Sequence, residues 1–101
     1  MKNMTIRGIV FALISHCITK QYGSKASKGI ERSRIVELAQ NQCNINAELI
    51  EKAFNWLDSE GYIKLHKQSV TIRKAGWELA DRYIKSFKRW YKQRNTSETA
   101  K

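Results

Sequence analysis

Hydrophobic residues recur at helical spacing in four stretches of the chain and alternate with polar residues in a fifth. The helical spacing predicts helices over residues 5–20, 34–41, 47–60 and 77–94. Between residues 62 and 72, hydrophobic and polar residues alternate on both sides of a short turn, which predicts an antiparallel hairpin. The pattern therefore predicts a mainly α fold with a small antiparallel β-hairpin.

The predicted helix over residues 47–60 has the clearest start and stop signals. Asn46 can cap it, Ile45 can pack onto Ile50 from outside the first turn, and Gly61 can end it because glycine adopts positive φ at little cost. Its core face is apolar. The side chains on the opposite face are those of Ala47, Glu48, Glu51, Lys52 and Asn55.

The first helix is expected to lie beneath the pair formed by the helices over residues 34–41 and 47–60. The helix over residues 5–20 is apolar over a broad face, so we expect it to be largely buried. Ser33 is expected to cap the helix over residues 34–41. The polar segment between them predicts a loop, and Ile30 near its end is expected to add a short third strand to the hairpin.

The helix over residues 77–94 carries an aromatic stripe that one small domain has little material to cover. We expect this stripe to bind a second copy of the chain around a two-fold axis. The expected dimer interface consists of Trp77, Ile84, Phe87, Trp90 and Tyr91. A monomer that buries the whole stripe in its own core is the alternative. In either case, residues 1–94 are expected to form one domain and residues 95–101 a disordered tail.

The formal net charge is +10, and the cations are unevenly distributed. Residues 1–30 contain five basic and no acidic residues, residues 31–60 contain three basic and six acidic, and residues 61–101 contain eleven basic and three acidic. An excess of this size favours a polyanionic partner, most often nucleic acid. A basic protein that binds no polyanion is the alternative.

The two cysteines form no recognisable pattern. Cys17 falls on the apolar face of the first helix and is expected to be buried, whereas Cys43 is expected in an exposed turn. Together with His16 and His66 they match no metal-ligand spacing, so we expect neither a disulfide framework nor a metal or other cofactor.

Other function classes are also not favoured. The longest apolar run, Ile9 to Ile14, is too short to span a membrane, and the N-terminus lacks the layout of a secretory signal, so we expect a soluble, cytoplasmic protein. The sequence shows no catalytic carboxylate pair, activated nucleophile or glycine-rich phosphate loop, so we expect no enzyme.

Residues 33–76 resemble the winged helix-turn-helix superfamily of DNA-binding regulators. The second helix of the pair closes in Leu57-Asp58-Ser59-Glu60-Gly61-Tyr62-Ile63, and the return strand ends in Ile72-Arg73-Lys74-Ala75-Gly76. Relatives often carry Leu-Thr-x-x-Gly at the latter place, and Arg73 replaces the threonine here. The resemblance implies a winged helix-turn-helix domain with an extra C-terminal helix.

The resemblance also implies that the helix over residues 47–60 enters the major groove while the wing, residues 64–70, contacts the backbone. The candidate DNA-binding residues are Lys25, Lys28, Arg34, Asn46, Glu48, Lys52, Asn55, Lys64 and Lys67. The implied function is sequence-specific binding of double-stranded DNA by a small homodimeric transcriptional regulator. The alternative is a winged-helix protein-interaction module that docks a partner through its acidic second helix.

Overall fold

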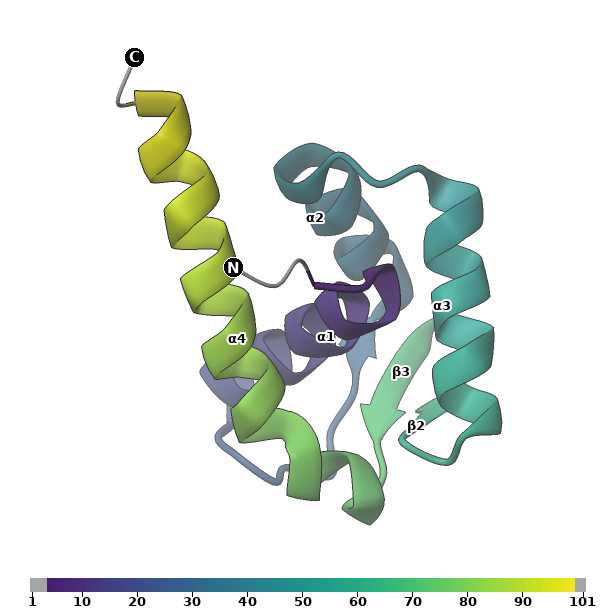
Figure 1. Ribbon diagram of the computed structural model, residues 1–101. Coiled ribbons are helices and arrows are strands. Elements are labelled where there is room, and N and C mark those ends of the chain that lie inside the picture. The colour runs from purple at the N-terminus through teal and green to yellow at the C-terminus, as the bar shows by residue number, and fades with distance from the viewer. Residues whose placement is uncertain (1–3, 100–101) are drawn as a thin grey trace.

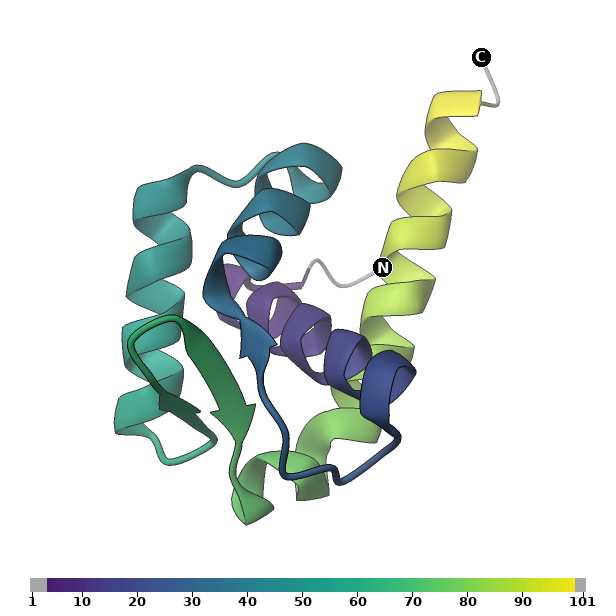
Figure 2. The ribbon, with the colours of Figure 1, turned by 180° about the vertical axis from the view of Figure 1, so that it is seen from behind.

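The computed structural model describes residues 4–99, and the side chains of residues 4–94. Its elements are, in chain order, α1 (Ile6–Tyr22), β1 (Ile30–Glu31), α2 (Arg32–Cys43), α3 (Ala47–Ser59), β2 (Ile63–Leu65), β3 (Ser69–Ile72) and α4 (Lys74–Thr99). The helices surround α1, and the small sheet closes one side of the body (Figures 1 and 2). The predicted fold class, mainly α with a small antiparallel hairpin, is confirmed.

Helix α1 is the centre of the core. Thr5 caps it, since its Oγ1 accepts a hydrogen bond from the amide of Gly8 at 3.0 Å. Residues 8–15 are all buried, because α2, α3 and α4 pack around this one helix. A helix covered on several sides needs apolar residues around most of its circumference, which explains the broad apolar face in the sequence.

The start and stop signals of α3 are confirmed. Asn46 caps the helix, with its Oδ1 accepting from the amide of Leu49 at 3.0 Å, and Gly61 has a φ of +81°. Ile45 and Ile50 are both buried at the start of this helix. These local signals act within one turn of chain, so the sequence alone was sufficient to place them.

The predicted cap of α2 is wrong. The helix begins at Arg32 rather than after Ser33, and its N-cap position is Glu31, whose side chain makes no capping bond. The reason is the sheet, since Ile30 and Glu31 pair with β3 and the chain enters the helix directly from that pairing. The helix also runs two residues beyond the predicted Asn41, to Cys43, and ends at Asn44 in a left-handed conformation.

The sheet has the strand order β1-β3-β2, with both pairings antiparallel. Ile30 pairs with Val70, which confirms the predicted third strand, and Ile63 pairs with Ile72. These four side chains are buried. Lys64 is exposed on the other face of the sheet, so the alternation in the sequence is the alternation between core and solvent.

Helix α4 is longer at both ends than predicted. It begins at Lys74 and continues through Thr99, so residues 95–99 of the expected disordered tail are helical, while residues 100–101 lie outside the described part. The helix packs across α1 and its C-terminal half extends past the rest of the molecule (Figure 1). Within the described residues, no helix is long and apolar enough to cross a membrane.

Both cysteines are buried free thiols. The prediction for Cys17 is confirmed, but Cys43 is not in an exposed turn. It belongs to the last turn of α2 and points into the core, because the helix continues further than the sequence pattern indicated. Burial raises the pKa of both thiols.

Candidate nucleic-acid interface

The outer face of α3 is open to solvent. Glu48, Glu51, Lys52 and Asn55 are exposed along it, as predicted, because the opposite face of the helix is held in the core by residues such as Phe54. Lys52 lies 3.8 Å from Glu48 one turn earlier, and both side chains remain mostly exposed. An exposed pair of this kind contributes little to stability, so both groups are free to contact a ligand.

Arg32, which no sequence pattern indicated as a binding residue, joins three elements beside this face. Its Nη2 donates to Oε2 of Glu51 on α3 at 2.9 Å, and its Nη1 donates to the carbonyl oxygen of His66 in the hairpin turn at 3.2 Å. Its guanidinium also lies 5.5 Å from the centre of the Phe54 ring. The wing is thereby fixed to the helix pair, and the charge of Glu51 is partly neutralised.

The wing consists of β2, β3 and the turn between them. The amide of His66 donates to the carbonyl of Ser69 at 2.9 Å, and the amide of Arg32 donates to the carbonyl of Gln68 at 3.0 Å. Lys64 and Lys67 are both exposed. The hairpin lies beside α3, and Asp58 of that helix accepts a hydrogen bond from the amide of Leu65 at 3.3 Å (Figure 2). The two elements form one surface.

Arg73 closes the base of the wing. Its amide donates to the carbonyl of Tyr62 at 3.0 Å and its Nε donates to the carbonyl of Ile63 at 3.2 Å. Three residues later, a Cβ on Gly76 would collide with the carbonyl oxygen of Tyr62. The arginine that departs from the winged-helix pattern therefore has a structural role, and the glycine that matches the pattern is required by packing.

Three of the predicted cations lie elsewhere. Arg34 faces α1, where its Nη1 donates to Oε1 of Gln21 at 3.2 Å, so Arg32 and not Arg34 is the arginine next to α3. Lys25 lies near the start of α4, in a shallow pocket with Trp77 and Asp81. Its loop joins α1 to β1, and the hairpin lies between this loop and α3 (Figure 2).

Lys28 lies at the end of that loop, next to Gly29, which packs closely on β3. Its Nζ lies 5.5 Å from the centre of the Tyr22 ring. The sequence could not distinguish Lys25 and Lys28 from the lysines of the wing. The position of a loop on the molecule depends on how the elements that it connects pack together. The structure therefore places Asn46, Glu48, Lys52, Asn55, Lys64 and Lys67 on the exposed surface of α3 and the hairpin, and separates Arg34 and Lys25 from that surface.

The residues of the expected dimer interface do not form one exposed patch. Phe87, Trp90 and Tyr91 form a cluster whose ring centres are 5.7–6.5 Å apart, and all three are half-buried. The hydroxyl of Tyr91 donates to Oε1 of Gln42 on α2 at 2.8 Å. Trp77 packs against the core at the other end of the stripe. The chain covers more of the stripe than the sequence pattern predicted.

No group of histidine, cysteine and carboxylate side chains that could hold a metal ion occurs within the described residues. His16 is half-buried between α1 and α4. Burial, followed by the nearby charges of Lys88 and Lys20, lowers its pKa. Among the described side chains, a surface of cations and hydrogen-bonding groups around α3 and the wing is the arrangement most suited to a ligand.

Comparison of the chain with protein-family models, with curated proteins and with solved structures gives no match.

Proposed function

We propose that the chain binds double-stranded DNA sequence-specifically, as a small homodimeric regulator of transcription. The observation that carries this proposal is the surface shared by α3 and the wing, which Arg32 joins through its bonds to Glu51 and to the carbonyl of His66. The major groove admits an α-helix, and α3 presents one open face of its 13 residues, while the hairpin beside it can reach the flanking backbone.

The charges on this surface are divided between the two elements. Lys64 and Lys67 of the wing suit phosphate oxygens, and Asn55 on α3 has the amide that pairs with an adenine edge. Glu48 disfavours phosphate but can accept from a cytosine amino group. The bond to Arg32 removes the main objection to Glu51, since its charge is partly compensated within the protein.

The proposed dimer uses the end of α4 that extends past the body. Phe87, Trp90 and Tyr91 are only partly buried, and a second copy would cover the part of the cluster that remains exposed. Two half-sites about one helical turn of DNA apart would then be bound by one dimer. A cytoplasmic location stays a prediction.

A protein-interaction module is the second candidate, and one observation favours it. Leu49, beside Glu48 at the start of α3, is one of two large hydrophobic side chains that are exposed among the described residues. An apolar side chain next to a carboxylate suits a protein partner better than a phosphate backbone.

Salt dependence distinguishes the two functions. A pool of random duplexes, selected on the purified chain, should yield a shared sequence whose affinity falls steeply as salt rises. The mass of the protein in solution, measured alongside, should be that of a dimer, and Trp90→Ala should shift it toward the monomer. Selection that yields no shared sequence, with weak affinity that does not depend on the duplex, would favour the interaction module.

A further inference from the structure

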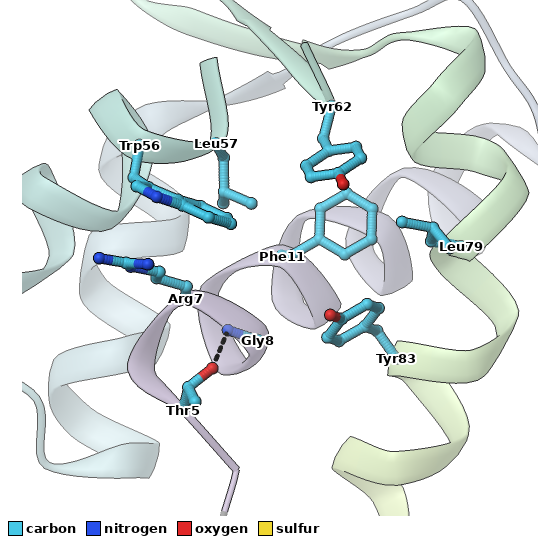
Figure 3. A pocket seen from close by; sticks show the side chains of 9 residues that line it. All are labelled: Thr5, Arg7, Gly8, Phe11, Trp56, Leu57, Tyr62, Leu79 and Tyr83. Atoms are coloured by element: carbon cyan, nitrogen blue, oxygen red, sulfur yellow. Dashed lines mark hydrogen bonds between the residues drawn. The ribbon is translucent and has the colours of Figure 1, made fainter. Parts of the chain in front are cut away.

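A pocket lies where α1, the end of α3, the start of β2 and α4 meet (Figure 3). Its volume is about 210 Å³. Phe11, Trp56, Tyr62 and Tyr83 provide aromatic walls, Gly8 lies on the α1 side, and Arg7 lies at the edge against Trp56. Neither the DNA-binding surface nor the proposed dimer contact uses this space.

The aromatic walls are held in place by contacts with one another. Phe11 meets Tyr83 edge to face with ring centres 5.3 Å apart, and Tyr62 lies 6.3 Å from Phe11 and 6.4 Å from Trp56. Gly8 leaves room for this arrangement, because a Cβ there would approach the Tyr83 ring to 3.3 Å. A planar ring can enter such a site without rearranging the walls.

Two tyrosine hydroxyls lie at the same space. The hydroxyl of Tyr83 is directed from α4 toward α1, and that of Tyr62 toward Phe11 (Figure 3). Among the hydrogen bonds of the described side chains, none involves either hydroxyl. Both hydroxyls remain within reach of solvent, so they can donate to or accept from a polar group of a ligand in the pocket.

Arg7 supplies a charge at the edge. Its guanidinium carbon lies 4.3 Å from the centre of the Trp56 ring, a contact that uses the flat face of the group. The N–H donors around the rim of the guanidinium make no ion pair with a described side chain. None of the described residues that line the pocket is acidic. The guanidinium N–H groups of Arg7 are therefore available to a carboxylate, to which they can donate two parallel hydrogen bonds.

We propose that this pocket binds a monocyclic aromatic carboxylate, with the ring among the four aromatic side chains and the carboxylate on Arg7. The volume is below the roughly 300–1,000 Å³ typical of sites for drug-sized ligands, so the pocket suits one ring rather than a fused system. The hydroxyls of Tyr62 and Tyr83 can donate to the carboxylate or to a ring substituent. The site does not depend on the proposed DNA binding.

The experiment uses 3-fluorobenzoate as the probe and the whole chain without DNA. Its fluorine resonance should broaden and shift on addition of protein, with a dissociation constant of about 1 mM or below. In a nitrogen-labelled sample, the indole N–H signal of Trp56 should move while those of Trp77 and Trp90 stay in place. The signal is assigned with Trp56→Phe. Benzoate should compete, whereas benzyl alcohol and cyclohexanecarboxylate should compete weakly.

Three variants test the assigned roles. Arg7→Gln should weaken binding about tenfold because a charge-assisted pair is lost. Tyr83→Phe keeps the ring and should weaken binding several-fold. Arg82→Gln, an exposed arginine on α4 that does not line the pocket, is the matched control and should leave the dissociation constant unchanged. The thermal midpoint of each variant verifies folding.

Four results would overturn the proposal. The first two are the absence of binding at about 10 mM probe and equal weakening by Arg7→Gln and Arg82→Gln. The third is that benzyl alcohol or cyclohexanecarboxylate competes as well as benzoate. The fourth is a shift of the Trp77 or Trp90 signal instead of that of Trp56. Because no DNA is present, failure of this proposal leaves the proposed function untouched, and the reverse also holds.

Discussion

Arg32 and Glu51 form an ion pair of 2.9 Å between the first residue of α2 and the exposed face of α3. The same guanidinium donates to the carbonyl of His66, so one side chain fixes both the helix pair and the wing. The side chains are 26% and 48% exposed, which means that solvent weakens the pair. Its main effect is therefore expected on the geometry and charge of the surface rather than on stability.

Arg32→Gln should lower the free energy of unfolding by only about 1 kcal/mol, measured by urea denaturation. It should also weaken duplex DNA binding, because Glu51 then presents its full charge to the phosphates. Adding Glu51→Gln should recover part of the lost affinity. A double variant that binds no better than Arg32→Gln would show that the charge of Glu51 is not what opposes DNA.

Lys67 and Lys25 offer a matched comparison, since both are exposed lysines but only Lys67 lies on the wing. Lys67→Glu should weaken duplex binding at least about tenfold at 0.1 M salt and make the affinity less dependent on salt. Lys25→Glu changes the net charge equally and should have a much smaller effect. Equal losses in the two variants would mean that general positive charge, and not this surface, attracts DNA.

Gly76 and Gly61 should respond differently to alanine. Gly76→Ala places a Cβ against the carbonyl oxygen of Tyr62 and 2.8 Å from Cγ2 of Ile72, so it should cost about 3 kcal/mol in the free energy of unfolding. Gly61→Ala meets no atom and strains only a residue with φ of +81°, which should cost about 1 kcal/mol. Chemical denaturation measures both values, and a reversed order would contradict the close approach at Gly76.

His16 should make stability depend on pH. Burial, with Lys88 and Lys20 nearby, lowers its pKa in the folded chain below the unfolded value of about 6.5. The unfolded chain therefore binds more protons as the pH falls through about 6.5, and the free energy of unfolding decreases until the lowered folded pKa is passed. Above about pH 7 this contribution is fully present.

The measurement is urea denaturation between about pH 7.5 and 5.5, above the range where carboxylates titrate. His16→Gln should reduce the slope of stability against pH. His66→Gln, at an exposed histidine of the wing, serves as the control and should retain the slope. A slope that survives His16→Gln unchanged would assign the dependence to other groups.

The sequence by itself determined the helices and the hairpin. It also determined those boundaries that depend on interactions within a single turn of the chain. The Asn46 cap, the stop at Gly61 and the alternation of Ile63, Lys64 and Val70 between core and solvent are all local effects of hydrogen bonding and burial. The third strand at Ile30 was also predicted, because a short strand often joins the hairpin in a motif of this kind, although its partner Val70 is distant in the sequence.

Only the tertiary structure decided which distant residues lie together. The start of α2 at Arg32 follows from the pairing of Ile30 with Val70, forty residues away, and that start turns Arg32 toward α3 and Arg34 toward α1. The pocket beside Arg7 likewise combines side chains from α1, from the segment between Trp56 and Tyr62, and from α4, which are far apart in the sequence. Side-chain direction on a helix changes by about 100° per residue. Arg32 and Arg34, two residues apart, therefore point to different sides of α2 and contact different helices.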